Sequence, residues 1–254
     1  MRKIGCMIIY NEAPYIGKAL NSLSMFVDEV VIVDGPYIDY PHSSVNSDDG
    51  TLELLDKFGS DGRVKLTVVT KNVAWQSQVE KRNEYLKYCA VGDLLFICDG
   101  DWQPVLLDSG EIFKDMSIFG FKGSVVKPDG KGGVVIFRWG NPLIFRKVKG
   151  LHYKYNHYSL YDGEGRSIFL PPYKLLEFYE SYQVYHVGEL RDADRAKDNW
   201  EYYGKALEYA SGLESDLYCC NCQASVKLSE GELIKCPKCG FGRIQAHVDN
   251  KPAS

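Results

Sequence analysis

The segment Leu94 to Trp102, LLFICDGDW, carries two carboxylates separated by one glycine, directly after a run of five apolar residues. An unbroken apolar run of this kind is typical of a strand buried on both faces of a parallel sheet. Because residues i and i+2 of an extended segment point the same way, we expect Asp99 and Asp101 to converge where the strand ends. Two close carboxylates repel each other unless a cation or protons intervene, and Mg²⁺ or Mn²⁺ is often held by one or two carboxylates together with substrate phosphates. The segment therefore predicts a divalent-cation site for a nucleotide diphosphate, with a solvated strand cap as the alternative.

A second cluster of reactive side chains lies near the carboxyl terminus, where five of the eight cysteines fall between Cys219 and Cys239. They include two C-x-x-C knuckles separated by thirteen residues, formed by Cys219, Cys222, Cys236 and Cys239. Four thiolates at this spacing suit a tetrahedral structural Zn²⁺ site. A disulfide pair in a secreted domain is the alternative, and either arrangement makes this segment a structural staple.

The composition bounds the class of protein. The 254 residues, 45% hydrophobic and 25% charged, are enough for one large domain and a small one, which we place at 1–214 and 215–254. The net charge is −4, and the lysines and arginines are scattered, so the sequence does not indicate a nucleic-acid partner. The apolar run after Met1 is too short for a signal peptide, and no run approaches the roughly 18 residues of a membrane span. We expect a cytoplasmic protein with no transmembrane segment.

The elements that must position these residues alternate between strand and helix. Apolar periodicity predicts strands over 4–10, 29–33, 64–70 and 94–98, and helices over 13–23, 51–58 and 78–89. Such alternation indicates an α/β fold, a mainly parallel sheet flanked by helices, with ligands bound beyond the carboxyl ends of its strands. The second half has less parallel character, since 124–127 and 134–139 predict a hairpin.

Neither common glycine-rich nucleotide loop, G-x-x-x-x-G-K-[ST] or G-x-G-x-x-G, occurs after the first strand. Instead, five stretches resemble the GT-A-fold glycosyltransferases, most closely the short family 2 type, over roughly residues 3 to 210. The stretches, in order, are Tyr10-Asn11-Glu12, the strand ending in Asp34, Ser47-Asp48-Asp49-Gly50-Thr51, Gln78 to Asn83, and the D-x-D of Asp99 and Asp101. The sequence departs from the family pattern at Pro36 to Ser44, an insert that is either a lid or a surface loop.

The resemblance implies transfer of a sugar from a nucleotide-diphosphate sugar to a glycan, lipid or protein acceptor that the sequence does not identify. It assigns nucleotide-sugar binding to Tyr10, Asn11, Glu12, Asp34, Gln78, Arg82 and Asp99. It assigns Mn²⁺ or Mg²⁺ to Asp99 and Asp101, where the cation would neutralise the charge growing on the leaving diphosphate. We expect Asp34 to face solvent, so that its removal weakens nucleotide binding while leaving the fold intact.

Three further residues are candidates in the second half. The segment Tyr185 to Arg191 resembles the one before the last helix of these enzymes, which makes His186 a third metal ligand, with a hydrogen-bonded strand-end histidine as the alternative. An inverting transferase also needs a base for the acceptor hydroxyl, for which Asp162 ranks ahead of His157. A retaining mechanism would need no such base. Aromatic residues that include Trp102 and Trp139 suit sugar stacking on the acceptor side.

Two other classes of function stay open. A sugar nucleotidyltransferase on a related sheet would show a Gly-rich loop bearing Arg and Lys after the first strand, where this chain has Asn11-Glu12-Ala13-Pro14. A non-catalytic adaptor with a zinc ribbon would bind a nucleotide without turning it over. The ribbon itself suits a folding staple or a homo-oligomer contact, and its few lysines also allow a docking role.

Overall fold

The computed structural model describes residues 1–38, 40–107, 111–128, 134–154 and 159–186, and the backbone of three short strands further on. The chain divides into two compact units, Met1–Asp192 and Ala193–Ser254. The domain boundary predicted after residue 214 lies outside the described residues. Within the described part, no helix has both the length and the apolar character that a membrane crossing requires.

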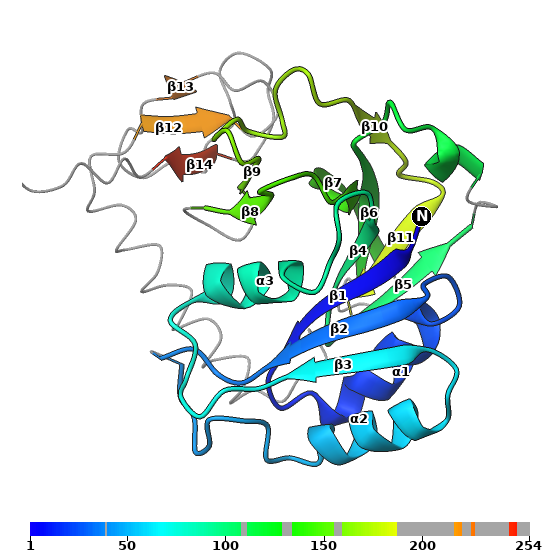
Figure 1. The fold of residues 1–254 in the computed structure, drawn as a ribbon, viewed down its shortest axis with the longest axis vertical. Helices are drawn as coiled ribbons and strands as arrows, with labels where there is room; N and C mark the ends of the chain where they lie inside the picture. The colour runs from blue at the N-terminus through cyan, green and yellow to red at the C-terminus, as the bar shows by residue number, and fades with distance from the viewer. Residues whose placement is uncertain are drawn as a thin grey trace, which may run out of the picture. The chain divides into compact units, whose positions relative to one another are not determined.

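The first half of the larger unit alternates strand and helix as the periodicity predicts (Figure 1). Its elements are β1 (Lys3–Ile9), α1 (Ala13–Leu23), β2 (Glu29–Asp34), α2 (Thr51–Ser60), β3 (Lys65–Val69), α3 (Gln78–Leu86) and β4 (Leu94–Asp99). Helix α1 has a proline in its first turn, and Ser77 caps α3 by accepting a hydrogen bond from the Glu80 amide. All seven predicted elements are confirmed, and only α3 ends clearly earlier than expected.

The second half is mostly strand. It contains β5 (Trp102–Leu106), the short 3₁₀ helix η1 (Glu111–Lys114), β6 (Gly120–Pro128), β7 (Val134–Arg146), β8 (His152–Tyr153), β9 (Leu160–Tyr161), β10 (Leu175–Glu177) and β11 (Tyr182–His186). Strands β6 and β7 pair antiparallel, which confirms the predicted hairpin and extends it. In the smaller unit, β12 (Asp216–Cys219), β13 (Ser225–Val226) and β14 (Ile244–His247) form an antiparallel sheet in the order β13-β12-β14.

A nine-stranded sheet joins both halves of the larger unit in the order β3-β2-β1-β4-β7-β6-β11-β5, with β10 beside β6. The neighbours from β3 to β4 are all parallel. Beyond β4 the sheet is mixed, because β7 is antiparallel to both of its neighbours and β11 is parallel to β6 but antiparallel to β5. The fold is therefore mixed α/β, and the half built by β1 to β4 is parallel throughout.

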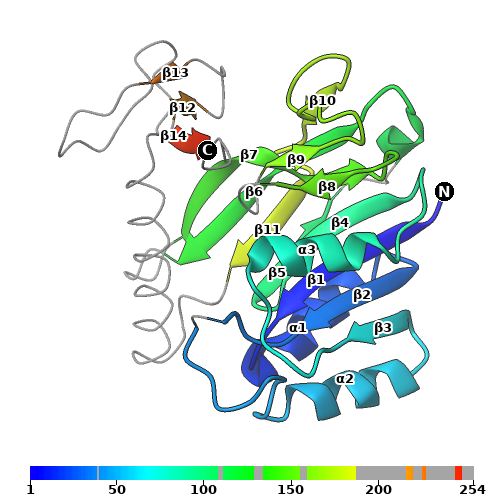
Figure 2. The ribbon, with the colours of Figure 1, turned by 60° about the vertical axis from the view of Figure 1, so that its left-hand side comes forward.

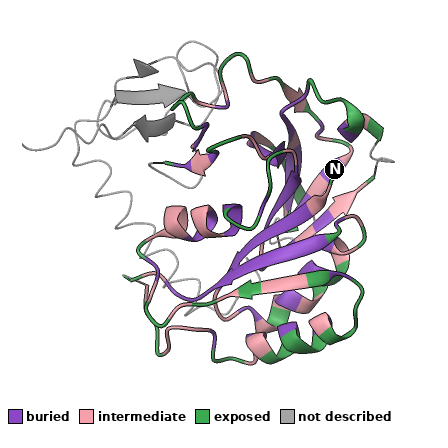
Figure 3. Ribbon diagram, viewed as in Figure 1, coloured by how far each residue is buried: buried purple, intermediate pink, exposed green. Residues whose placement is uncertain are grey.

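Two hydrophobic cores cover the two faces of the parallel half, which carries helices on both sides (Figure 2). The strands between these cores are mostly buried, except for β3 at the edge (Figure 3). Helices α1 and α2 pack on one face and α3 packs on the other. Along β4, Phe96 and Cys98 join the core under α1 and α2, whereas Leu95 and Ile97 join the core under α3. Burial on both faces explains why the run before Asp99 contains no polar residue.

Candidate functional site

The carboxyl ends of β1, β2 and β4 lie side by side. We call this region, which consists of the strand ends and residues 10–12, 34–35 and 99–101, the carboxyl edge. In the parallel register, Ile9 of β1 lies opposite Asp34, and Ile8 lies opposite Asp99. The structure thus brings the predicted polar residues after three separate strands to one edge. This is the place where open α/β sheets bind their ligands.

Asp34 is fully buried, so the expectation that it faces solvent is wrong. Its carboxylate accepts hydrogen bonds from the Ser47 amide (2.9 Å) and the Ser47 hydroxyl (2.5 Å). Its backbone oxygen accepts one from Trp75 Nε1 at 2.6 Å. The insert after Gly35 returns the chain so that Ser47 covers the strand end, a contact that no local pattern in the sequence indicates. Asp34 therefore organises the loop that follows it, whatever else it contacts.

The Ser47 to Thr51 stretch is hydrogen bonded to the loop after β1. Asn11 Nδ2 donates to Asp48 Oδ1 at 3.1 Å, and the Asp48 amide donates back to Asn11 Oδ1 at 2.9 Å. The amides of Asn11 and Glu12 donate to the hydroxyls of Ser47 and Thr51, at 2.7 and 2.8 Å. Asn11 has φ 53°, a left-handed conformation that asparagine tolerates better than most residues. These bonds make the two loops one unit, and the family-like stretch from Ser47 to Thr51 is the sequence signal for it.

The insert between Gly35 and Ser47 is anchored near both ends. The Trp75 amide donates to the Pro36 oxygen (2.9 Å), and the Ile38 amide donates to the Trp75 oxygen (2.8 Å). Further along, the Tyr10 hydroxyl donates to the Ser44 oxygen at 3.2 Å. Gly35 has φ +116°, and a Cβ there would lie 3.0 Å from Trp75 Nε1, so the sharp exit from β2 requires glycine. Of the two possibilities for the insert, these anchors favour a fixed surface loop.

Asp99 and Arg82 form an ion pair at the carboxyl edge. Arg82 Nη2 lies 2.9 Å from Asp99 Oδ1 and 3.2 Å from Oδ2, and the side chains are 5% and 29% exposed. Burial by itself would lower the pKa of Arg82, but the Asp99 carboxylate raises it well above the ordinary value. The Arg82 Nη1 also donates to the Tyr85 hydroxyl, which donates to the Tyr153 hydroxyl at 2.9 Å. The structure thus joins two predicted nucleotide-binding residues to each other and leaves part of Asp99 open to solvent.

Asp101 lies in a turn and not on an extension of β4. The strand ends at Asp99, and Gly100 and Asp101 turn the chain into β5, so the extended geometry predicted for Asp99 to Asp101 is wrong. A Cβ on Gly100 would lie 2.7 Å from Glu12 Cγ, so glycine here admits the buried Glu12 side chain. The tight packing of the loop after β1 against this turn is the physical reason for the glycine.

His186 ends β11 and lies beside this turn. In the antiparallel pairing of β11 with β5, His186 lies opposite Trp102. Its Nε2 is 3.1 Å from Asp101 Oδ2, with the Asp101 side chain 7% exposed and the His186 side chain 22% exposed. The buried His186 Nδ1 has no hydrogen-bond partner among the described residues. The structure therefore brings together the predicted metal ligands Asp101 and His186, which are far apart in the sequence.

Lys81, on α3, is buried against the carboxyl edge, and no sequence pattern singles it out. Its side chain is 1% exposed, and its Nζ donates to the backbone oxygens of Ile9 (2.6 Å) and Gly35 (2.7 Å). Burial lowers the pKa of Lys81 to about 7, although the carboxylates of Asp34, Asp99 and Glu12 oppose that shift. Helix α3 has the most polar sequence of the three helices of the parallel half, and a lysine in it predicts a solvated side chain, so no local signal marks Lys81 as buried.

A crevice of about 30 Å³ lies beside Arg82, on the side of the second half. Its walls are Arg82, Ile97, Trp102, Trp139, Asn141, Pro142, Leu143, Tyr153 and Leu160. The Trp102 ring meets the rings of Trp139 and His186 edge-on, each at 6.2 Å between centroids. Two of the aromatic residues predicted to suit sugar stacking, Trp102 and Trp139, therefore line a hollow next to the Asp101 turn.

Asp162 serves the local structure of its own loop. Its carboxylate accepts hydrogen bonds from the Tyr173 hydroxyl (2.6 Å), from Arg166 Nε (2.8 Å), and from the amides of Glu164 and Arg166 (both 2.9 Å). The Tyr173 hydroxyl contributes most to holding the pKa of Asp162 well below its usual range, and Arg166 adds to it. A carboxylate that is so strongly stabilised in its charged form is a weak proton acceptor, which does not favour the predicted role as catalytic base.

The remaining predicted residues contribute less to the described geometry. Gln78 is the first residue of α3 and is half-buried. The predicted base His157 lies outside the described residues. Of the four knuckle cysteines, only the backbone of Cys219, in β12, is described, and Cys222, Cys236 and Cys239 lie outside.

Comparison with known proteins finds no matching family model and no matching curated protein. Among solved structures, the chain is similar to residues 1–349 of S. aureus TarS in complex with UDP, at 21% identity over 76% of this chain and 49% of that one, with a TM-score of 0.39. The same TarS segment with UDP-GlcNAc gives 20% identity over 76% and 48%, with a TM-score of 0.39. The mannosyltransferase PcManGT from Pyrobaculum calidifontis, with GDP-Man and Mn²⁺, gives 18% over 54% and 44%, with a TM-score of 0.37. The chain spans about half the length of the TarS chains, and likenesses this distant assign it neither a family nor a function.

Proposed function

We propose that this chain is a glycosyltransferase that binds a nucleotide-diphosphate sugar at the carboxyl edge with the help of a divalent cation. The proposal rests on the family-like stretches of the sequence and on the geometry of the larger unit. Acidic and amide side chains lie at the carboxyl edge of the parallel half-sheet, where sheets of this kind bind their ligands.

The observation that carries the proposal is the contact between Asp101 and His186. The two residues come from elements that only the folded sheet brings together, β11 beside the turn before β5. Their facing atoms, Asp101 Oδ2 and His186 Nε2, are 3.1 Å apart and largely shielded from solvent. A carboxylate and an imidazole that face each other at the carboxyl edge form a pair of potential metal ligands.

The chemistry of this pair fits a divalent cation. Ions of this kind bind oxygen at roughly 2.1 Å, so adjacent ligands of an octahedral ion lie about 3 Å apart, close to the observed separation. Carboxylates suit Mg²⁺ and Mn²⁺, whereas imidazole suits transition metals, so the mixed set favours Mn²⁺. Asp99 is a weaker candidate, because its carboxylate already pairs with Arg82. When bound, the cation would supply neutralising charge to the leaving diphosphate.

The other residues of the carboxyl edge would position the donor. The unit formed by the Tyr10–Glu12 loop and the Ser47–Thr51 stretch presents backbone and side-chain groups beside Asp34. The Arg82 guanidinium orients the Asp99 carboxylate, leaving its exposed part to accept hydrogen bonds from a ribose. Trp102, which follows Asp101 in the chain, and Trp139 line the crevice beside Arg82. The sugar acceptor and its base stay unassigned.

The test is a thermal-shift panel with UDP-GlcNAc, UDP-glucose and GDP-mannose, each with and without Mn²⁺. We expect at least one donor to raise the melting temperature, and to do so more strongly with Mn²⁺. Asp101→Asn should remove the Mn²⁺-dependent part, whereas the exposed control Asp56→Asn on α2 should keep it. No shift with any donor would reject the proposal, and binding without hydrolysis or transfer of the sugar would favour a non-catalytic adaptor.

We also propose that the four cysteines Cys219, Cys222, Cys236 and Cys239 hold one structural Zn²⁺, an inference that rests on their spacing alone. Metal analysis of protein purified without chelator should find about one equivalent of zinc. Replacement of Cys236 by Ser should lower that content sharply, and replacement of the extra thiol Cys220 by Ser should not. A disulfide between the knuckles would contradict the assignment.

A further inference from the structure

Lys81 occupies the fork where β1 and β2 separate. Its Nζ donates to the oxygen of Ile9, the last residue of β1, and to the oxygen of Gly35, the first residue beyond β2. The Gly35 amide also donates to the Ile9 oxygen, at 3.2 Å. One side chain of α3 therefore joins the two strand ends at the point where their loops begin.

The loops that leave this fork are the ones that carry the candidate nucleotide-binding residues. Ile9 is followed by Tyr10–Glu12, and Gly35 follows Asp34. Arg82, the next residue of α3, holds Asp99 at the end of β4. Two consecutive side chains of one helix thus connect to the ends of β1, β2 and β4.

Burying an ammonium group is costly, and a residue that only filled the core would not need one. A methionine or leucine would occupy a similar volume without losing the hydration of a charge. The hydrogen bonds of Lys81 go to neutral carbonyl oxygens, so no direct ion pair with a described residue offsets the cost of its burial. The Tyr37 ring lies 5.2 Å from Nζ, and the charged groups that act on it from neighbouring elements are Asp34, Asp99, Glu12 and Arg82. The three nearby carboxylates favour the charged form of Lys81, which partly offsets the cost of its burial.

We propose that Lys81 is a positioning residue of the nucleotide-sugar site, which holds the ends of β1 and β2 together so that the Tyr10–Glu12 loop and the Asp34–Ser47 loop face the same ligand. This role rests on the proposed function as far as the ligand is concerned. The coupling of the two loops through Lys81 does not depend on the ligand, and it is tested without one.

The experiment compares wild type with Lys81→Met, which keeps the side-chain length but removes charge and donors. Lys87→Met is the control, because Lys87 is an exposed lysine at the end of the same helix, paired with Glu84. Amide hydrogen exchange is measured in peptides covering residues 9–13 and 34–48, which contain the amides bonded to Ser47, Thr51 and Asp34. Peptides from the opposite end of the sheet, around Asp28 and Leu94, report global opening.

We expect Lys81→Met to speed exchange in the two loops by roughly tenfold, the size of effect that loss of one or two buried hydrogen bonds produces, and to leave the peptides around Asp28 and Leu94 unchanged. Affinity for whichever of UDP-GlcNAc and GDP-mannose binds wild type should fall by a similar factor. Lys81→Gln, which keeps a donor without the charge, should recover part of both effects. It also replaces Lys81→Met if that variant lacks the wild-type circular dichroism spectrum.

Unchanged exchange in both loops would overturn the proposal, and so would faster exchange spread evenly over the sheet, which would mark Lys81 as an ordinary contributor to stability. If wild type binds none of UDP-GlcNAc, UDP-glucose and GDP-mannose, the proposed function fails. The loop-holding role is then decided by exchange alone: acceleration confined to the two loops keeps it, and any other pattern overturns it.

Discussion

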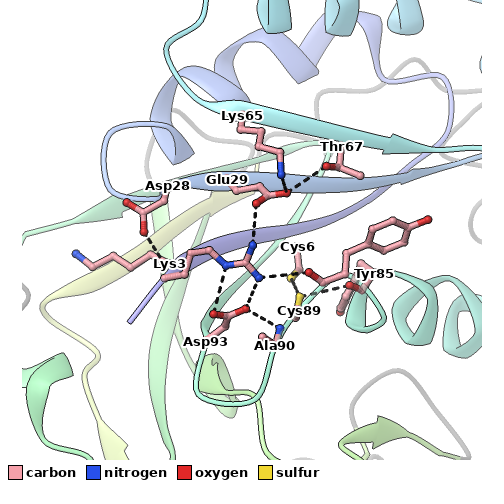
Figure 4. A network of polar contacts seen from close by, with 12 residues as sticks. Lys3, Cys6, Asp28, Glu29, Lys65, Thr67, Tyr85, Cys89, Ala90 and Asp93 are labelled. Carbon is pink, nitrogen blue, oxygen red and sulfur yellow. Dashed lines mark hydrogen bonds and ion pairs between the residues drawn. The ribbon is translucent and has the colours of Figure 1, made fainter.

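Charged side chains at the two ends of the parallel half-sheet have different kinds of partner. At the amino ends of β1, β2 and β4, Arg2 pairs with Glu29 (3.1 Å) and with Asp93 (2.6 Å), and Lys65 pairs with Glu29 (3.0 Å). Figure 4 shows Glu29, Lys65 and Asp93 within this network. Each of these two carboxylates faces a cationic side chain directly. At the carboxyl edge, Asp99 also pairs with Arg82 (2.9 Å), but Asp34 is bonded to Ser47, Asp101 faces His186, and the buried Lys81 donates to backbone oxygens.

The amino-end pairs stabilise the fold, whereas the proposed function assigns the carboxyl edge to a ligand. Charges that are paired at the amino ends gain from each other and need nothing further. In the proposed function, the carboxyl edge binds a cation and a diphosphate beside Asp101 and His186. The comparison predicts that substitutions at the amino ends change stability, and that substitutions at the carboxyl edge change binding and turnover first.

The largest expected effect is on Asp101. In the proposed mechanism, Asp101→Asn removes a charged ligand of the cation, and we expect sugar transfer or donor hydrolysis to fall by about 100-fold or more, as for loss of a main electrostatic contact in a transition state. The melting temperature without ligand should change little, because asparagine keeps an oxygen that can face His186. Activity is measured by release of nucleoside diphosphate with and without EDTA. Full activity of this variant in EDTA would contradict the metal-dependent mechanism.

Replacing Asp34 tests whether the carboxyl edge is purely functional. Because the Asp34 carboxylate accepts both the amide and the hydroxyl of Ser47, Asp34→Ala should reduce the free energy of unfolding by about 2 to 3 kcal/mol in addition to weakening nucleotide binding. Urea unfolding of Asp34→Ala, Ser47→Ala and the double variant measures the coupling between them. Purely additive losses would show that the two residues do not stabilise each other.

The amino-end network should respond in the opposite way. Asp93→Asn removes the charge that Arg2 faces but keeps the shape of a side chain that also accepts from the Ala90 amide at 2.7 Å. We expect a loss of about 1 kcal/mol in stability, since the Arg2 side chain is 40% exposed and solvent weakens the pair, with donor affinity and turnover unchanged. Denaturant unfolding and the transferase assay report the two quantities. A clear loss of turnover at wild-type stability would break the distinction between the two ends.

The last prediction concerns stability alone and is a pH dependence that comes from Lys81. Its pKa falls from 10.5 to about 7 on folding because it is buried. Between these values the unfolded chain binds more protons than the folded one, so stability rises with pH in this window, and the full cost of burying the charge is present below pH 7. The slope is at most about 1.4 kcal/mol per pH unit relative to Lys81→Met, in which it should vanish. Urea unfolding across this window for both proteins gives the difference, and parallel curves would contradict the buried charge.

Much of the fold followed from local patterns. The apolar runs of β1, β2 and β4 predicted strands because burial on both faces excludes polar residues, and the amphipathic spacing of α1 predicted its buried face, Ile16, Ala19, Leu20 and Leu23. Strand β5 was not predicted, because it begins directly after the turn at Gly100 and Asp101. The polar residues of that turn predicted a binding site and not the start of a strand. The mixed second half was seen only as one hairpin, since its short strands pair over long separations.

The sequence by itself determined the alternation of strands and helices around the parallel half-sheet and the placing of Asp34 and Asp99 at the ends of its strands, because periodicity and strand length are properties of neighbouring residues. Only the tertiary structure decided which partner each charge has. Ser47 covers Asp34 because an insert returns the chain, Lys81 is buried because α3 packs against the ends of β1 and β2, and His186 reaches Asp101 because β11 pairs with β5. These contacts join residues that are distant in the chain, and burial in the folded sheet determines their energies more than the identity of their neighbours in sequence does.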